Sequence, residues 1–398
     1  MNKSSMLLVL ILISSIYAGT IEFTIASSDE WVSKAPLSHP RRELGVTSVN
    51  GKIYAIGGLG SSGVLKVNEE YDPNADIWTE KTAMLTPRAN IGVCVYQNKI
   101  YCIGGTTSGG VNERYITHQF SEINVTGLNE VYDPTTNTWE TKSSMPTPRA
   151  DVSVSVVNGK IYAIGGYDAN LKSIGINEVY DPLNDSWIVE TSMLNEVSNC
   201  ASVVVDNNIF FFGGKIDPFG SDEQLTITQL YNTETKTWSY KQSIPNTPRS
   251  PVAVLTSDIF APKKIYVIDY NKNYVYDLED DSWSTATPAK LGNDRFGLAV
   301  VDDLIYQVGG GSGSFPSLYF YDRTEQYIPL GYDGLHLPDS LVTPSPTLSP
   351  TPIPTPTPTA SPEPESFPTT LVIASVAIVA IVGLGILAYF KKTKKRNL

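Results

Sequence analysis

Cysteine and histidine are scarce in this chain of 398 residues, which contains three of each. An odd, irregularly spaced set of cysteines excludes a disulfide framework and fits small buried side chains instead. Three isolated histidines give no sign of a metal site, and no other cofactor or group of catalytic residues is apparent. Positive charge is also limited, because the net charge is −12 and five basic residues lie in the last eight positions. An acidic body argues against nucleic acid as a partner.

The two ends of the chain have the composition of targeting and membrane segments. Residues 1–27 place Lys3 before an apolar run, a pattern typical of a secretory signal peptide, although an uncleaved anchor remains an alternative. Residues 369–390 carry no charge and are long enough to span a bilayer. Residues 391–398 form a basic tail, which places the C-terminus in the cytoplasm. We therefore expect a single-pass cell-membrane protein whose body is extracellular.

Proline is concentrated just before the predicted span. Residues 339–368 are dominated by proline, threonine and serine. Proline fixes φ and removes hydrogen-bond donors, so this segment should be an extended stalk that cannot form a core. The folded body is then residues 28–338.

A short phrase recurs throughout that body and is clearest near its middle. Asn158-Gly159 has the composition of a two-residue hairpin turn, and Gly165-Gly166 ends the strand that follows. Tyr180 and Trp187 then belong to two further strands, joined by a turn that begins at Asp181. The phrase therefore predicts a four-stranded antiparallel sheet.

Six copies of this phrase occur, and the Gly-Gly pair is present in five of them. The fifth copy has Ile268-Asp269 instead. In five copies a Tyr stands seven residues before a Trp, and these tryptophans are Trp78, Trp139, Trp187, Trp238 and Trp283. Spaced in this way, the pattern resembles the kelch motif. The resemblance implies an all-β, six-bladed kelch-type β-propeller, followed here by a C-terminal transmembrane helix.

The ends of the repeat array indicate how the ring closes. Trp31 precedes Arg41 by the spacing that separates Trp78 from Arg88, so it resembles an outer strand that lacks its own first three strands. The sixth copy ends at Tyr321, with Ile328 where a Trp should stand. We predict that the N-terminal strand around Trp31 completes the last blade. The alternative is that residues 325–330 close that blade themselves.

Arginine recurs where the chain enters the innermost strands. The five positions are Arg41, Arg88, Arg149, Arg249 and Arg295. A ring of guanidinium groups at the channel mouth would hold an anionic or polyhydroxyl ligand. The alternative is structural: each Arg bonds turn carbonyls or a carboxylate of the next blade, because a residue repeated in every blade often serves the repeat.

One loop breaks the symmetry of the repeats. The second copy has an insertion within residues 106–129 that carries Arg114, Tyr115, His118 and Phe120. Arginine with aromatic side chains suits contact with a sugar or peptide. A surface loop without a binding role explains the insertion equally well. Two N-glycosylation sequons begin at Asn124 and Asn184.

The sequence therefore favours a surface-anchored module that binds an extracellular protein or glycan. Kelch propellers also include copper radical oxidases resembling galactose oxidase, but the three histidines are too few and too scattered for such a centre. An extracytoplasmic carbohydrate enzyme resembling the bacterial sialic acid mutarotase is a second hypothesis. A structural envelope component is a third.

Overall fold

The computed structural model describes residues 28–107, 124–218, 224–290, 292–313 and 317–333. Within these ranges the chain forms strands and no helix. No helix long and apolar enough to cross a bilayer therefore occurs among the described residues. The predicted signal peptide, stalk, membrane span and basic tail all lie outside them.

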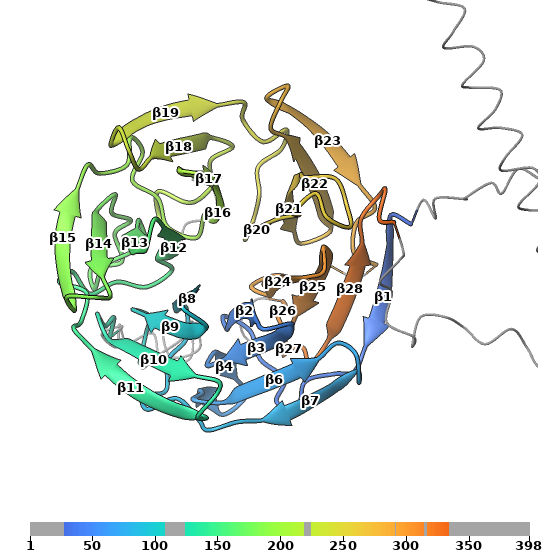
Figure 1. The fold of residues 1–398 in the computed structure, drawn as a ribbon, viewed down its shortest axis with the longest axis horizontal. Helices are drawn as coiled ribbons and strands as arrows, with labels where there is room; N and C mark the ends of the chain where they lie inside the picture. Colours follow the sequence, from blue (N-terminus) through green and yellow to red (C-terminus); the bar gives the residue numbers. More distant parts are fainter. Residues whose placement is uncertain (1–27, 108–123, 219–223, 291, 314–316, 334–398) are drawn as a thin grey trace, which may run out of the picture. The chain divides into compact units, whose positions relative to one another are not determined.

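Six four-stranded antiparallel sheets surround a central opening as the blades of a propeller (Figure 1). The strands of each blade are given from the innermost outward. Blade 1 consists of β2 (Gly45–Val49), β3 (Lys52–Ile56), β6 (Asn68–Asp72) and β7 (Ile77–Glu80), and blade 2 of β8 (Gly92–Tyr96), β9 (Lys99–Ile103), β10 (Asn129–Asp133) and β11 (Thr138–Lys142). Blade 3 consists of β12 (Ser153–Val157), β13 (Lys160–Ile164), β14 (Asn177–Asp181) and β15 (Ser186–Glu190).

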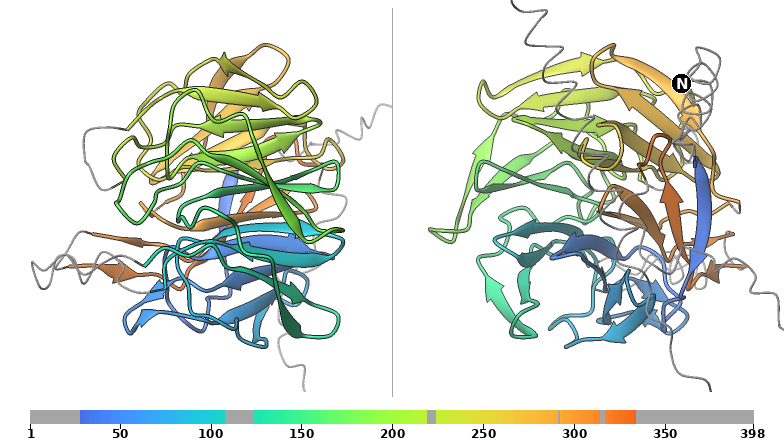
Figure 2. Two further views of the ribbon diagram at one scale, coloured as in Figure 1. Left: turned by 90° about the vertical axis from the view of Figure 1, so that its left-hand side faces the viewer. Right: turned by 45° about the vertical axis from the view of Figure 1, so that its right-hand side comes forward.

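The remaining blades are given in the same order. Blade 4 consists of β16 (Ala201–Val205), β17 (Asn208–Phe212), β18 (Thr228–Asn232) and β19 (Thr237–Lys241), and blade 5 of β20 (Val252–Leu255), β21 (Ile265–Asp269), β22 (Lys272–Asp277) and β23 (Ser282–Ala286). Blade 6 consists of β24 (Gly297–Val301), β25 (Leu304–Val308), β28 (Thr324–Ile328) and β1 (Glu30–Lys34). Two small hairpins, β4 (Leu59–Gly60) with β5 (Gly63–Val64) and β26 (Gly311–Ser312) with β27 (Tyr319–Phe320), extend the loops between second and third strands. The β26–β27 hairpin projects from one face of the ring (Figure 2).

The N-terminal strand closes the ring, as predicted. β1 pairs with β28 and completes blade 6, with Trp31 opposite Tyr327. One detail of the prediction is wrong, because the third-strand tyrosine of this blade is Tyr327 and not Tyr321. The β26–β27 hairpin delays the third strand, and Tyr321 lies just beyond that hairpin. The alternative closure by residues 325–330 is therefore excluded.

Each tryptophan fastens its blade to the preceding one. Trp187 donates its indole N–H to the carbonyl oxygen of Ser143 at 2.8 Å, and the amide of Ser143 donates to Asp185 at 2.8 Å. The ring of Trp187 also packs on that of Tyr180, with the centroids 5.0 Å apart. The same indole-to-carbonyl bond crosses all six blade boundaries of the described ring, from Trp31, Trp78, Trp139, Trp187, Trp238 and Trp283.

Nearer the centre, the Gly-Gly pair forms a backbone hydrogen bond to the next blade and allows the two backbones to approach closely. Gly165 and Gly166 both have positive φ, at 71° and 94°. The amide of Gly166 donates to the carbonyl oxygen of Val197 in blade 4 at 3.0 Å, and a Cβ on Gly165 would lie only 2.8 Å from that oxygen. A side chain at Gly165 would therefore push the next blade away.

Apolar residues pack between blades as well as within them. One core cluster joins Tyr101 and Ile103 of blade 2 to Ile161 and Ala163 of blade 3. Cys94 lies opposite Tyr101 across its hairpin, and the three cysteines form no disulfide. Because a single blade leaves such faces uncovered, the ring is the unit that folds.

Replacing the tryptophan of blade 3 tests this account. We expect Trp187→Ala to lower the free energy of unfolding by roughly 3–5 kcal/mol, because the ring contact and the bond to Ser143 are both lost. Chemical denaturation measures the change. Its neighbour Ile188 is 58% exposed, so Ile188→Ala is the control and should change stability by less than about 0.5 kcal/mol. Equal stability of the two variants would contradict the account.

Candidate functional site

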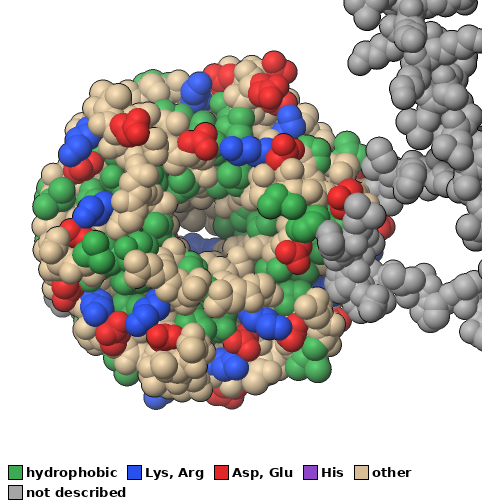
Figure 3. Space-filling model, viewed as in Figure 1, with side chains coloured by type: hydrophobic (Ala, Val, Ile, Leu, Met, Phe, Trp, Pro, Cys, Tyr) green, Lys and Arg blue, Asp and Glu red, His purple; other side chains and the backbone are tan. Residues whose placement is uncertain are grey.

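One face of the propeller carries the mouth of the central channel. The connections between blades and the loops from second to third strands both emerge there. Two positions before each innermost strand stands a residue that lines the central cavity, and we call these six the mouth residues: Glu43, Asn90, Asp151, Asn199, Ser250 and Arg295. The cavity has a volume of about 260 Å³ and appears as the hollow at the centre of Figure 3.

Backbone geometry explains most of these residue types. Five of the six mouth residues have positive φ, between 49° and 58°, and they are Glu43, Asn90, Asp151, Asn199 and Arg295. Asn and Asp adopt this conformation more readily than other side chains do. The backbone therefore favours short polar groups at the mouth, whereas Glu43 and Arg295 need another reason to be there.

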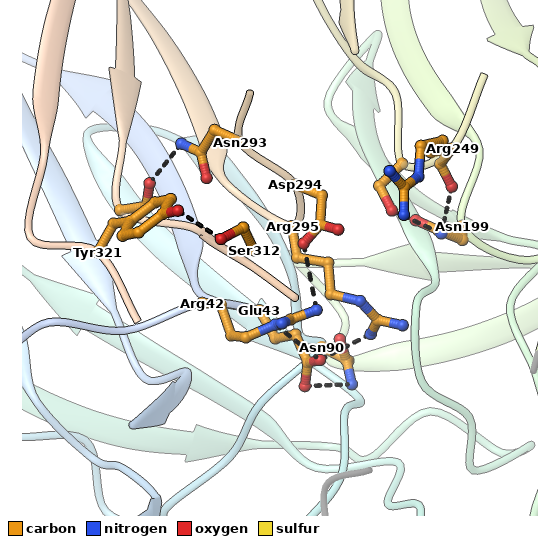
Figure 4. A network of polar contacts seen from close by, with 12 residues as sticks. Arg42, Glu43, Asn90, Asn199, Arg249, Asn293, Asp294, Arg295, Ser312 and Tyr321 are labelled. Atoms are coloured by element: carbon orange, nitrogen blue, oxygen red, sulfur yellow. Dashed lines mark hydrogen bonds and ion pairs between the residues drawn. The ribbon is translucent and has the colours of Figure 1, made fainter. Parts of the chain in front are cut away.

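That reason is an ion pair between blades 1 and 6. Arg295 donates from Nη1 to Oε1 of Glu43 at 2.7 Å, and Asn90 of blade 2 donates to Oε2 at 3.3 Å. Arg42 lies 3.6 Å from the same carboxylate and forms a second pair with Asp294 at 3.2 Å. Figure 4 shows these side chains gathered on one side of the mouth.

Backbone hydrogen bonds between mouth residues join neighbouring blades on the same side of the ring. The amide of Glu43 donates to the carbonyl oxygen of Arg295 at 2.8 Å, that of Asn90 to Glu43 at 2.9 Å, and that of Asp151 to Asn90 at 3.0 Å. On the other side of the mouth a side-chain hydrogen bond joins blades 4 and 5, in which Asn199 donates from Nδ2 to Oγ of Ser250 at 3.3 Å. Blades 6, 1, 2 and 3 are thus joined more directly at the mouth than blades 4 and 5.

Charges near the mouth shift one another's pKa values. Burial raises the pKa of Asp151 to about 6, and Glu43 adds to the effect while Arg295 and Lys215 oppose it. Burial also lowers the pKa of Lys215, and the positive charge of Arg295 lowers it further. The guanidinium of Arg249 lies over the ring of Tyr270, 4.7 Å from its centroid. A raised carboxyl pKa inside a cleft is typical of functional sites.

The predicted ring of five arginines does not form. Arg41, Arg88 and Arg149 are fully buried. Each pairs with a glutamate on the third strand of its own blade, not of the next one, and the three partners are Glu69, Glu130 and Glu178. The separation is 3.2 Å for Arg149 and Glu178, and burial lowers the pKa of Arg149 to about 10. These three arginines hold the blade together, as the structural alternative supposed.

The last two arginines occupy different positions in the repeat. Arg295 lies two residues before its innermost strand and Arg249 three, whereas Arg149 lies four before. In blade 6 the place of Arg149 is taken by Asn293, which donates to the carbonyl oxygen of Gly309 at 2.8 Å. Only Arg249 and Arg295 of the five therefore reach the mouth face with exposed surface. Glu43, Asn90, Asp151, Asn199 and Ser250 were not identified from the sequence.

The insertion of blade 2 opens on this same face. Arg114, Tyr115, His118 and Phe120 lie outside the described residues, but the strands leading to them do not. The amide of Thr107 donates to the carbonyl oxygen of Asn124 at 3.0 Å, so the two ends of the insertion are adjacent. Asn124 and Asn184 of the sequons are both exposed. Among the described residues no group of acidic, Cys and His side chains is arranged to hold a metal ion.

Comparison with known proteins agrees with the repeat pattern. A family model described as the kelch motif matches residues 40–85, 87–121 and 148–194. Kelch-like protein 28 of Homo sapiens is 26% identical over 149 residues, and that of Mus musculus is 25% identical over the same length. These matches cover 37% of this chain but only 17% of each relative.

A likeness to a solved structure covers more of the propeller. The structure of YjhT matches with a TM-score of 0.57 at 15% identity, over 74% of this chain and 99% of that one. At this identity the likeness supports the fold alone.

The buried Arg–Glu pair can be tested with residues that the chain itself supplies. Blade 4 has Val197 and Gln229 in the places of Arg149 and Glu178. We expect Arg149→Val to cost roughly 3–5 kcal/mol of unfolding free energy, because Glu178 is left buried without its cation. Adding Glu178→Gln should recover at least about 1 kcal/mol in denaturant unfolding.

Arg249→Val at the exposed mouth position is the control and should cost no more than about 1 kcal/mol, because it removes only the contact of the guanidinium with the ring of Tyr270. A double variant no more stable than Arg149→Val would contradict the pairing.

The pKa of Asp151 predicts a pH dependence of stability. The folded pKa of about 6 lies above the usual value near 3.9, so the folded state binds the proton more tightly. Proton binding by Asp151 therefore contributes to the stability of the folded state. This stabilisation is fully present below about pH 4 and is lost as the pH rises through about 6. We expect Asp151→Asn to gain melting temperature relative to the parent protein between pH 4 and pH 7.

The control is Asp206→Asn, because Asp206 is exposed and has a similar φ of 54°. A constant difference in melting temperature between Asp151→Asn and the parent protein at both pH values would contradict the prediction.

Proposed function

We propose that this chain, which is a kelch-repeat β-propeller, is displayed on the cell surface and binds an extracellular protein through its mouth face. Kelch propellers typically serve as protein-binding modules. The finer parts of the proposal, extracellular display and the choice of face, come from the ends of the sequence and from the distribution of loops. A glycan partner is the alternative outcome of the test below.

The observation that carries the proposal is the gathering of differences between blades on the mouth face. The β4–β5 hairpin, the β26–β27 hairpin and both ends of the blade 2 insertion all belong to loops on that face. On the opposite face the turns between first and second strands contain two residues, except in blade 5, where residues 256–264 form a longer connection. Loops that vary on a rigid scaffold are where binding specificity is usually built.

Display outside the cell is supported by the composition of the two ends. The signal-like residues 1–27 favour export, and the uncharged residues 369–390 with the basic tail favour one span with the propeller outside. The proline-rich residues 339–368 then act as a spacer between membrane and propeller. This arrangement would present the propeller to large partners.

Site-specific photo-crosslinking on intact cells tests both the face and the location. A benzophenone amino acid at Ile216, which is 49% exposed and follows Lys215 on the mouth face, should capture a protein. The matched control is Leu183, which is 77% exposed in the turn between β14 and β15 on the opposite face. We expect an adduct from Ile216 and none from Leu183.

External protease added before illumination should release the propeller and abolish the adduct. An adduct from Leu183 alone would contradict the choice of face, and an adduct that resists protease would contradict extracellular display. Loss of the adduct after enzymatic deglycosylation would identify a glycan partner and overturn the choice of a protein.

A further inference from the structure

Blade 5 leaves a gap in the rim of the mouth. Its second and third strands are joined on the mouth face by two residues, Tyr270 and Asn271. The shortest such loop in the other five blades is residues 57–67 of blade 1. The long connection of blade 5, residues 256–264, lies on the opposite face instead. The rim is therefore lowest over Tyr270 and Asn271, and we call this place the notch.

The notch uncovers an arginine. In the other five blades, the residue just before the mouth residue forms a β-bridge to the second-to-third loop and is at most 8% exposed. In blade 5 this residue is Arg249, which has no such loop to pair with and is exposed. Figure 4 shows Arg249 apart from the ion pairs around Glu43. The five covered residues are Arg42, Ala89, Ala150, Ser198 and Asp294.

The guanidinium of Arg249 has an aromatic support but no acidic partner. It lies over the ring of Tyr270, 4.7 Å from the centroid, and it forms no ion pair within the described part of the chain. The ring also lies close to Gly292, where a Cβ would be 2.5 Å from its Cζ. Tyr270 has a φ of 41°, a conformation that is uncommon for an aromatic residue. Backbone strain of this kind is often found at binding sites.

Two lysines add positive charge around the same ring. Lys272 is partly exposed and directly follows the turn, and Lys290 is exposed and lies two residues before Gly292. Among the described residues neither lysine forms an ion pair. The carboxylate of Asp269 beside the turn is 2% exposed and already accepts from two backbone amides, at 3.0 and 2.8 Å. The notch therefore carries cations without a paired anion, on a chain whose net charge is −12.

We propose that the notch binds an acidic peptide segment of the protein partner. Carboxylates of the segment pair with Arg249 and Lys272, and its chain passes over Tyr270 toward the central cavity. Ser250, which follows Arg249, lines that cavity, and a volume of about 260 Å³ admits a short stretch of chain but no folded domain. The inference rests on the proposed function, because it names the part of the partner that the mouth face recognises.

An acidic peptide fits the notch better than the alternatives. A guanidinium group that is stacked on a ring keeps its planar set of donors in place, and this arrangement suits a carboxylate. A neutral sugar would cover the cations without compensating their charge, and a basic segment would be repelled. A single exposed ion pair contributes little to binding, so the segment needs several acidic residues.

Fluorescence anisotropy of the full-length chain in detergent tests the inference. The probe is a fluorescein-labelled octaglutamate, and the comparison probes are octaglutamine and an oligogalacturonate of equal charge. We expect octaglutamate to bind, and octaglutamine to bind at least about tenfold more weakly, a loss of about 1.4 kcal/mol. Octaglutamate binding should also weaken as salt is raised from about 50 mM to about 500 mM, because salt screens exposed charges.

Variants locate the site on the mouth face. Replacing Arg249 and Lys272 together by Gln should weaken octaglutamate binding at least about tenfold. Tyr270→Asn keeps a residue that tolerates positive φ but removes the ring, and it should weaken binding at least about twofold. The matched control is Lys66→Gln, because Lys66 is an exposed lysine in the mouth-face loop of blade 1, and it should leave binding unchanged. Cooperative unfolding of each variant confirms that it is folded.

The inference is overturned by absence of octaglutamate binding at about 1 mM, by equal binding of octaglutamine, by tighter binding of oligogalacturonate, or by full affinity in the double variant. Crosslinking from Ile216 on cells separates it from the proposed function. An adduct that forms in the parent chain and persists in the double variant overturns the acidic segment and leaves the protein partner in place. Absence of an adduct from the parent chain contradicts the proposed function instead, while the peptide titration still decides what the notch binds.

Discussion

The ring depends on a pair of hydrogen bonds by which five of the six blades hold one residue in the connection from the preceding blade; blade 4 makes only the indole bond of the pair. At the closure, Thr287 donates its amide to Asp29 and accepts from the indole of Trp31, at 2.8 and 2.9 Å. Ser143 is held in the same way by Asp185 and Trp187. Because one residue is fixed at both its donor and its acceptor, the outer strands cannot slide past one another. A four-stranded sheet with two apolar faces becomes stable only when these bonds close the circle.

Blades 4 and 5 depart from this regularity. Lys236 stands in the turn of blade 4 where the other blades place Asp or Asn, and it pairs with Glu190 at 2.8 Å instead. Blade 5 lacks the Gly-Gly pair, and its places are taken by Asp269 and Tyr270 rather than by Ile268 and Asp269. Asp269 accepts from the amides of Arg249 and Ser250 at 3.0 and 2.8 Å. The periphery tolerates these changes because the indole bonds persist in both blades. The side of the mouth formed by blades 4 and 5 is therefore free to carry residues that the repeat does not require.

The sequence predicted the architecture because the residues that hold it recur at constant spacing. The seven-residue interval from Tyr180 to Trp187 reflects one cross-strand pair and one turn, so a count of residues suffices to find it. Closure by Trp31 followed from the same count. Tyr321 was misassigned as a third-strand residue because the length of the β26–β27 hairpin cannot be read from residue types.

The mouth was harder to predict, since it depends on register rather than on motif. Arg149 and Arg295 look equivalent in the sequence, yet a shift of two positions buries the first in an ion pair and places the second at the channel. Asp151 occupies the same register as Arg295. The local feature that the two positions share is a positive φ angle, which the structure shows and the sequence does not. Residues that serve the repeat compensate one another within each blade, as Arg149 and Glu178 do. A charge without such a partner, as at Asp151, has no role in the repeat that the described contacts reveal, so its position cannot be found by counting residues between repeats.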